Sequence, residues 1–260
     1  MDVATLFGLA GRRALVTGGT SGIGVAVAEA LVSAGASVLA TSDREADCAS
    51  AADALGRKGL AVETLCLRLS GKDSAERLAR TASARLGGPV DVLVCNAGIE
   101  GPVGPTGSAQ ETDYLRVFDV NLHSAYWLAS AIAPGMREAG GGAIVLMASL
   151  SAMRGARMIG PYAMSKAALA QAARNLAVEF GPHNIRANAV APGLIETPFS
   201  RTLMDDAAFM KRRLAATPLR RVGQPSEIAA TTLWLVSPGG AFTTGQTIVV
   251  DGGTLVGDGS

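Results

Sequence analysis

A tyrosine and a lysine four residues apart, Tyr162 and Lys166, form a pair that could do acid–base chemistry. On a helix, residues at this spacing share one face, so the lysine ammonium can lie close to the phenol. A free tyrosine titrates at about 10, and a nearby ammonium favours the phenolate and lowers that pKa. Gly160 and Pro161 read as the helix start, which puts Tyr162 in the first turn. Taken alone, the pattern also fits two residues on an exposed helix face.

A serine ahead of the tyrosine, Ser149, is a candidate for holding a substrate oxygen beside the phenol. It follows an apolar run at 143–148 that reads as a strand, and ligands of parallel sheets bind beyond the carboxyl ends of the strands. Ser151 is a second candidate. Either serine also suits a loop position in which the hydroxyl bonds its own backbone. The geometric role favours Ser149.

A glycine-rich turn between an early strand and a helix has the composition of a phosphate cradle. The strand at 14–16 runs into this turn, and a helical pattern begins at Val25. Glycines permit a tight turn and let a pyrophosphate approach the helix N-terminus, where free N–H groups and the helix dipole favour an anion. The spacing is GxxxGxG, and a plain strand-to-helix turn is the alternative. The expected cradle residues are Gly18, Thr20, Ser21, Gly22, Ile23 and Gly24.

The elements that position these residues alternate between short apolar strands and longer helical segments. Near-continuous apolar runs are typical of strands buried on both faces of a parallel sheet. The order predicts an α/β fold, a doubly wound and mostly parallel seven-stranded Rossmann sheet with helices on both faces. No linker or repeat interrupts the pattern, so we expect a single domain over 1–260. The predicted strands are 14–17, 37–41, 61–67, 92–95, 143–148, 185–190 and 247–250.

Composition excludes several other classes of protein. The 260 residues are 48% hydrophobic and 17% charged, with a net charge of +1, which disfavours nucleic acid and membrane partners. His123 and His183 have no ligand-spaced partners, so we expect no protein-held metal. Three cysteines without CxxC spacing and an N-terminus without a signal core favour the cytoplasm.

Further motifs join the glycine turn and the Tyr162–Lys166 pair. They are Asn96, Ala97 and Gly98 after the fourth strand, and Pro192 and Gly193 after a later one. With these motifs in order from Gly11 to Gly253, the sequence resembles the short-chain dehydrogenase/reductase family, and more weakly its carbonyl-reductase branch. The resemblance covers nearly the whole chain.

The resemblance implies roles for the candidate residues. Tyr162 would be the general acid/base, Lys166 would tune it and hold the nicotinamide ribose, and Ser149 would hold the substrate oxygen. Asn121 matches an asparagine that helps a water-linked proton relay, although a buried amide satisfying backbone groups fits equally. The implied activity is hydride transfer between a nicotinamide cofactor and a carbonyl or secondary alcohol. The alternatives are an NADPH-preferring carbonyl reductase and a catalytically silent dinucleotide-binding sensor.

The choice between NAD and NADP turns on Asp43, which lies 19 residues after Gly24. An acidic residue there bonds the adenosine ribose 2′-OH, although Asp43 also suits the cap of a helix beginning near Glu45. Arg44 could accept a 2′-phosphate. Because NADP-preferring relatives often carry a basic residue at the places of Ser21 or Asp43, NAD is expected over NADP. Relatives usually have an aspartate where Arg68 stands, so the adenine contact is left unassigned.

Two segments bear on substrate and assembly. Residues 194–215 alternate apolar and charged side chains, which suits a lid over the substrate. A surface helix packed on the core would show the same pattern of side chains. Within the family pattern, Ile195 and Thr197 would join Pro192 and Gly193 on the nicotinamide side. The helix at 161–180 has no clear polar face, so we expect a homo-oligomer, a dimer or a tetramer.

Overall fold

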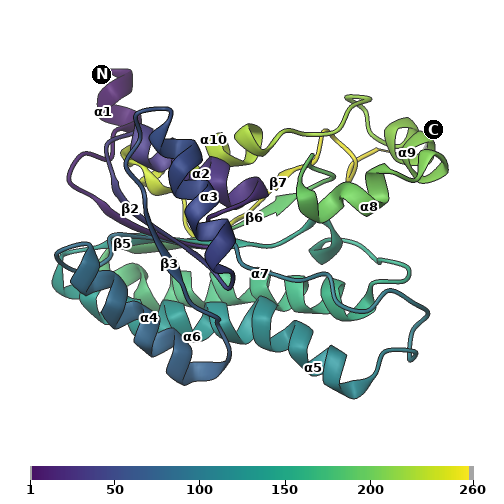
Figure 1. Cartoon of the computed structure of the whole chain (residues 1–260), viewed down its shortest axis with the longest axis horizontal. Helices are drawn as coiled ribbons and strands as arrows, with labels where there is room; N and C mark the ends of the chain where they lie inside the picture. Colours follow the sequence, from purple (N-terminus) through teal and green to yellow (C-terminus); the bar gives the residue numbers. More distant parts are fainter. Residues whose placement is uncertain (1, 258–260) are drawn as a thin grey trace.

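The computed structural model describes residues 2–257 and contains a seven-stranded sheet (Figure 1). Every adjacent pair of strands is parallel, and the strand order is β3-β2-β1-β4-β5-β6-β7. The doubly wound fold expected from the strand–helix alternation is therefore confirmed, with all strands parallel. The strands are β1 (Arg13–Thr17), β2 (Ser37–Ser42), β3 (Glu63–Cys66), β4 (Val92–Cys95), β5 (Gly142–Met147), β6 (Ile185–Pro192) and β7 (Thr247–Val250).

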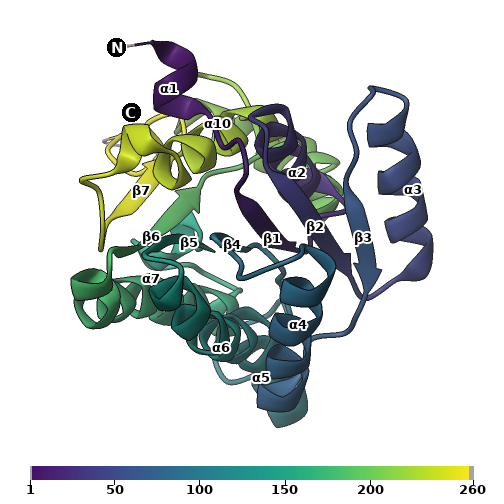
Figure 2. The same cartoon turned by 90° about the vertical axis from the view of Figure 1, so that its left-hand side faces the viewer.

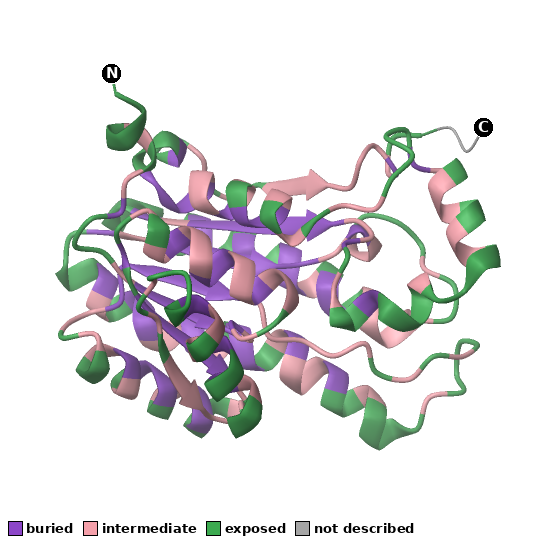
Figure 3. Ribbon diagram, turned by 45° about the horizontal axis from the view of Figure 1, so that its top comes forward, coloured by how far each residue is buried: buried purple, intermediate pink, exposed green. Residues whose placement is uncertain are grey.

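Helices cover both faces of the sheet (Figure 2). Side chains alternate along each strand, so Leu15 packs with α4, α6 and α7, whereas Val16 packs with α2 and α10 on the other face. Buried residues gather on the strands and on the inward sides of these helices, while α8 and α9 are mostly exposed or intermediate (Figure 3). The helices other than α1, α8 and α9 are α2 (Gly22–Ser33), α3 (Glu45–Gly56), α4 (Gly71–Arg85), α5 (Glu111–Phe118), α6 (Ser124–Glu138), α7 (Gly160–Phe180) and α10 (Pro225–Val236).

Short elements complete the chain. The predicted strand at 61–67 is shorter in the structure, because β3 is an edge strand whose four residues pair only with β2. None of the helices within residues 2–257 combines the length and apolarity needed to cross a membrane. The short elements are α1 (Val3–Phe7), α8 (Arg201–Met204), α9 (Ala207–Ala215), a π-helix η1 (Asp119–His123), and the 3-10 turns η2 (Leu150–Ala152), η3 (Gly181–His183), η4 (Pro198–Ser200) and η5 (Pro238–Gly240).

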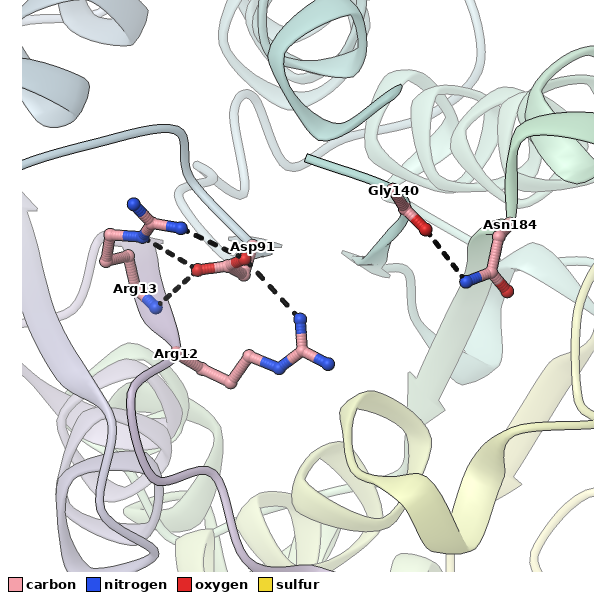
Figure 4. Close-up of polar contacts among 5 residues, drawn as sticks. All are labelled: Arg12, Arg13, Asp91, Gly140 and Asn184. Atoms are coloured by element: carbon pink, nitrogen blue, oxygen red, sulfur yellow. Dashed lines mark hydrogen bonds and ion pairs between the residues drawn. The ribbon is translucent and has the colours of Figure 1, made fainter. Parts of the chain in front are cut away.

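Polar contacts close the edge of the sheet where the strands begin (Figure 4). Asp91, which precedes β4 and is 5% exposed, accepts from the Arg13 Nε and backbone N–H, both at 2.9 Å, and lies 3.5 Å from Arg12 Nη1. Asn184, after η3, donates to the Gly140 carbonyl at 3.0 Å. These contacts tie the start of β1 to the start of β4, and the start of β5 to the start of β6. The opposite edge, where the strands end, is left for the loops that carry the candidate site.

Candidate active site

The glycine turn presents the start of α2 to the space beyond β1. Gly18 and Gly22 adopt left-handed backbone conformations, with φ of +60° and +51°, that disfavour any side chain. A Cβ on Gly24 would overlap the Gly18 carbonyl, so the helix and the turn approach as closely as glycine allows. Ser21 is the N-cap, yet no side chain caps α2. The turn therefore fits a pyrophosphate, whose oxygens would take the place of the missing cap.

The turn after β4 is clamped to the glycine turn. The Thr17 hydroxyl accepts hydrogen bonds from the Asn96 and Ala97 N–H groups, each at 3.1 Å, and the Asn96 side chain donates to the Gly18 carbonyl at 2.9 Å. Thr17 was not singled out from the sequence, and its only signal was a polar residue ending an apolar strand. Cys95 is buried, and burial raises the pKa of its thiol to about 12. The clamp fixes the glycine turn and the turn after β4 relative to each other.

Asn121 is fully buried in the π-helix between α5 and α6. Its amide donates to the Ile99 carbonyl at 2.9 Å and to the Ser165 hydroxyl at 3.1 Å, and its Oδ1 accepts from the Ile99 N–H at 2.8 Å. A Cβ built on Gly98 would lie 3.2 Å from the Asn121 Oδ1 and 3.3 Å from the Lys166 ammonium. Asn121 thus satisfies the backbone groups of Ile99, and the Gly98 contacts place it near the lysine.

Tyr162 and Lys166 lie in the first turns of α7, which begins at Gly160 with Pro161 in its first turn. Lys166 is 4% exposed, and its ammonium donates to the Met147 carbonyl at the end of β5 over 2.7 Å. The same nitrogen lies 5.7 Å from the centre of the Tyr162 ring. Burial lowers the pKa of Lys166 to about 8.

The environment of Tyr162 corrects one expectation. Burial raises the pKa of the phenol, the adjacent Ser149 hydroxyl opposes this, and the negative charge of Glu100 adds to it. The predicted lowering by Lys166 is not seen, because the ammonium bonds the Met147 carbonyl and desolvation of the phenolate dominates. Ser149 also accepts from the Ser151 N–H at 3.2 Å, so it bonds its own backbone and lies beside the tyrosine.

The segment after β6 approaches the glycine turn. Gly193 leaves no room for a Cβ, which would fall 2.7 Å from the Cα of Asp251, and Ile195 is buried and pairs with Gly223. A Cβ on Gly22 would lie 3.2 Å from the Thr197 side chain. Thr197 is therefore a neighbour of the glycine turn, whereas Gly193 and Ile195 pack against Asp251 and Gly223.

Two further residues border Tyr162: Phe199, which belongs to the segment expected to form a lid, and Glu100, which the sequence did not single out. The ring of Phe199 lies 6.2 Å from the Tyr162 ring, centre to centre, and remains 52% exposed. Glu100 follows the turn after β4, and its pKa is raised by burial. Phe199 lies in the turn η4, two residues after Thr197, and Glu100 lies two residues after Gly98, so each follows a predicted cofactor residue in sequence.

At the adenosine side, Asp43 follows β2 and is exposed. Helix α3 begins at Glu45 with Arg44 as its N-cap, and no side chain caps it, so the capping alternative for Asp43 is wrong. Arg44 lies 3.6 Å from Asp47 on the surface. Arg68 is exposed two residues after β3. The Asp43 carboxylate and the guanidinium groups of Arg44 and Arg68 therefore remain accessible to a ligand.

Known proteins are similar to this chain both in sequence and in fold. The family model described as enoyl-(acyl carrier protein) reductase matches residues 18–254. Dehydrogenase/reductase SDR family member 4 of Bos taurus is 37% identical over 93% of this chain and 86% of its own length. A tropinone reductase homolog of Arabidopsis thaliana is 36% identical over 95% of this chain and 80% of its own.

Solved structures are also similar to this chain in fold and in sequence. A gluconate 5-dehydrogenase from Burkholderia cenocepacia, in complex with NADP and tartrate, has a TM-score of 0.92 at 32% identity and covers 98% of this chain and 99% of its own. A 7α-hydroxysteroid dehydrogenase, complexed with NADH and 7-oxo glycochenodeoxycholic acid, has a TM-score of 0.92 at 33% identity, over 97% and 98% of the two chains.

The parallel sheet, its glycine turn and these relatives define a nicotinamide-dependent oxidoreductase. More narrowly, the chain belongs to the short-chain dehydrogenase/reductase family, as its motifs predicted.

Proposed function

We propose that this oxidoreductase moves a hydride between NAD and a carbonyl or secondary alcohol, with Tyr162 as the general acid/base. The observation that supports it best is the meeting of three side chains where β5 ends: Ser149 beside the Tyr162 phenol and the Lys166 ammonium over its ring. In this arrangement the substrate oxygen would lie between the Ser149 and Tyr162 hydroxyls, on the side of the Tyr162 ring that faces the nicotinamide.

Each group has a defined task in this mechanism. The glycine turn would hold the pyrophosphate, Lys166 the ribose, and the segment from Pro192 to Thr197 the nicotinamide, which supplies or accepts the hydride. In reduction the Tyr162 hydroxyl donates its proton to the substrate oxygen, and in oxidation the phenolate accepts it back. The positive charge of Lys166 would favour that phenolate, whereas burial of the phenol opposes it and dominates its pKa. Asn121 holds the Ile99 turn beside the lysine.

Replacing the tyrosine tests the mechanism against the silent-sensor alternative. In Tyr162→Phe the ring remains and the proton is lost, so kcat should fall at least about 100-fold. NADH binding, followed by its fluorescence, should be unchanged. Wild-type protein should oxidise NADH with some member of a carbonyl panel. Normal turnover by Tyr162→Phe would refute the mechanism, and no turnover by the wild type would favour the sensor.

We also propose NAD as the preferred cofactor, with NADP as the alternative. An exposed Asp43 can bond the ribose 2′-OH and repels a 2′-phosphate, while Arg44 beside it could bind that phosphate. Asp43→Ala should therefore raise the ratio of NADPH to NADH use, measured as kcat/KM. Asp53→Ala, an exposed acid further along α3, is the matched control. An unchanged ratio in Asp43→Ala would remove the basis for the NAD preference.

We propose further that the protein is one domain, that residues 194–215 form a lid, and that copies associate through α6 and α7. Tyr126 on α6 and Met164 and Val178 on α7 are exposed at 43%, 49% and 82%. Light scattering at micromolar concentration should give a dimer or tetramer, and a stable monomer would refute the association.

The three cysteines are free, which suits the proposed cytoplasmic location. Cell fractionation tests that location.

A further inference from the structure

Met158, four residues before Tyr162, has a strained backbone. Its φ is +75°, a left-handed conformation that is unfavourable for a residue with a long side chain. The Met158 carbonyl accepts a hydrogen bond from the Gly104 N–H at 2.7 Å, which joins the loop after β5 to the loop after β4. Strain of this kind persists only where the surrounding structure fixes the residue, and it is concentrated at active sites and ligand-binding segments. The strained backbone therefore indicates a role for Met158 in the site.

The Met158 side chain does not fill the core. The residue is 40% exposed, and Val103, which precedes Gly104 on the loop that bonds Met158, is 61% exposed. Removing such apolar side chains from water is favourable, and exposed apolar surface that gathers beside a site marks a place where a ligand binds. An apolar body placed on these two side chains would therefore gain the free energy of their burial.

Phe199 borders Tyr162 from the other side. In the strand order β5 lies between β4 and β6, so the loops after β4 and β6 flank the loop after β5 that leads to Tyr162 (Figure 2). Met158 is bonded to the loop after β4, whereas Phe199 belongs to the segment after β6. The Phe199 ring lies 6.2 Å from the Tyr162 ring, centre to centre, and Leu203, one helical turn later, is 37% exposed. Exposed apolar side chains thus lie on both sides of Tyr162.

Three kinds of occupant can cover these side chains: the substrate, residues 194–215 closing onto the loop after β4, or a second copy of the chain. Tyr162 lies between the two apolar groups, so whatever covers both of them also lies over the phenol. A second copy in that position would keep the substrate away from its proton donor. Closure that joins Phe199 directly to Met158 would do the same. The substrate is the occupant that covers both groups and still brings a carbonyl to the phenol.

We propose that the substrate is a ketone or secondary alcohol with an apolar body, and that Met158 and Phe199 bind this body on the two sides of Tyr162. This inference rests on the proposed function, because Tyr162 places the carbonyl between them. The flexible, polarisable side chain of a methionine packs well against aliphatic chains and rings. Both residues determine specificity, and neither takes part in the proton transfer.

Binding without turnover tests the apolar body separately from the reaction. Ketones are titrated by calorimetry into the protein saturated with NAD or NADP, whichever it binds; cofactor and ketone are then both oxidised, so no hydride can move. The probes are cyclohexanone and its 4-methyl, 4-ethyl and 4-butyl derivatives. Kd should fall about 10-fold or more from the first to the last, since a fully buried methylene favours binding by about 4-fold. The polar 4-hydroxycyclohexanone should bind no more tightly than cyclohexanone.

Substitutions assign this gain to the two residues. Met158→Gly and Phe199→Ala should each reduce it to about 3-fold or less, whereas Met158→Leu, which keeps an apolar side chain, should keep most of it. Phe242→Ala is the matched control, because Phe242 is a fully exposed phenylalanine that precedes β7 at the edge where the strands begin. Glycine adopts a φ of +75° without strain, so Met158→Gly should unfold at the same or a higher urea concentration than the wild type. A methionine with a merely structural role would lower that concentration and leave the gain intact.

The remaining outcomes separate this inference from the proposed function. Equal Kd values across the series, undetectable binding of every member, or a full gain in both Met158→Gly and Phe199→Ala would overturn it. A change of molecular mass in Phe199→Ala, measured by light scattering, would assign the surface to a second copy and overturn it as well. Reduction of any ketone that depends on the Tyr162 hydroxyl would still leave the proposed function intact. Failure of the wild type to reduce any ketone would refute the function, while the binding series would still decide whether the apolar site exists.

Discussion

At the scale of the residue, the reactivity of Tyr162 depends on the groups packed around it. Desolvation of the phenolate dominates, the Ser149 hydroxyl opposes it, and Glu100 adds a like charge. Residue types and the four-residue spacing predicted which side chains meet. They could not predict the direction of the pKa shift, because Glu100 reaches the phenol from a loop more than sixty residues away in sequence.

Glu100→Gln should shift the pH dependence of the reaction. Removing the negative charge lowers the pKa of Tyr162, so the phenolate forms at lower pH. Alcohol oxidation needs the phenolate, and its rate should therefore rise at lower pH than in the wild type. Carbonyl reduction needs the phenol, so its rate should begin to fall at lower pH. Steady-state pH profiles measure both, with Glu138→Gln on α6 as the control, and coincident profiles would contradict the role of Glu100.

At the scale of the element, the site depends on contacts between segments that are distant in sequence. Asp119, in the π-helix that carries Asn121, accepts from the Ser70 hydroxyl at 3.0 Å and from the Gly71 N–H at 3.1 Å. It thus caps α4, which the local N-cap Ser70 leaves uncapped. The same contact fixes the π-helix to the body of the protein.

Asp119→Ala should lower the free energy of unfolding by about 1 kcal/mol, because α4 loses its cap. The π-helix also loses its anchor, so kcat/KM should fall as Asn121 loosens. Asp73→Ala is the matched control, an exposed acid in the first turn of α4. Urea unfolding and steady-state kinetics measure the two effects. A stability equal to that of Asp73→Ala would show that the cap contributes nothing.

At the scale of the whole molecule, the two edges of the sheet have different tasks. The edge where the strands begin is closed by Asp91, the paired arginines and Asn184, whereas the edge where they end carries the loops of the site. The contacts that stabilise the fold and the loops that carry the site therefore lie at opposite ends of the strands.

Asp91→Ala should cost about 3 kcal/mol of unfolding free energy, because it leaves a partly buried guanidinium without a partner. Asp47→Ala, which removes an exposed ion pair with Arg44, should cost less than about 1 kcal/mol. Urea unfolding of the two variants compares them directly. Because Asp91 lies at the far edge, its variant should keep the wild-type KM while folded, and a changed KM would contradict the separation of the edges.

The sequence by itself determined the alternation of strands and helices in a doubly wound sheet, the glycine turn and the family, because apolar runs, glycine positions and short spacings act locally. The Tyr162–Lys166 pair could be recognised from the sequence for the same reason, since both residues lie on one face of α7. Only the tertiary structure decided that Lys166 bonds the Met147 carbonyl, and that burial, with the negative charge of Glu100 adding to it, raises the pKa of Tyr162. Charge interactions and desolvation depend on distances through space, and loop packing sets those distances.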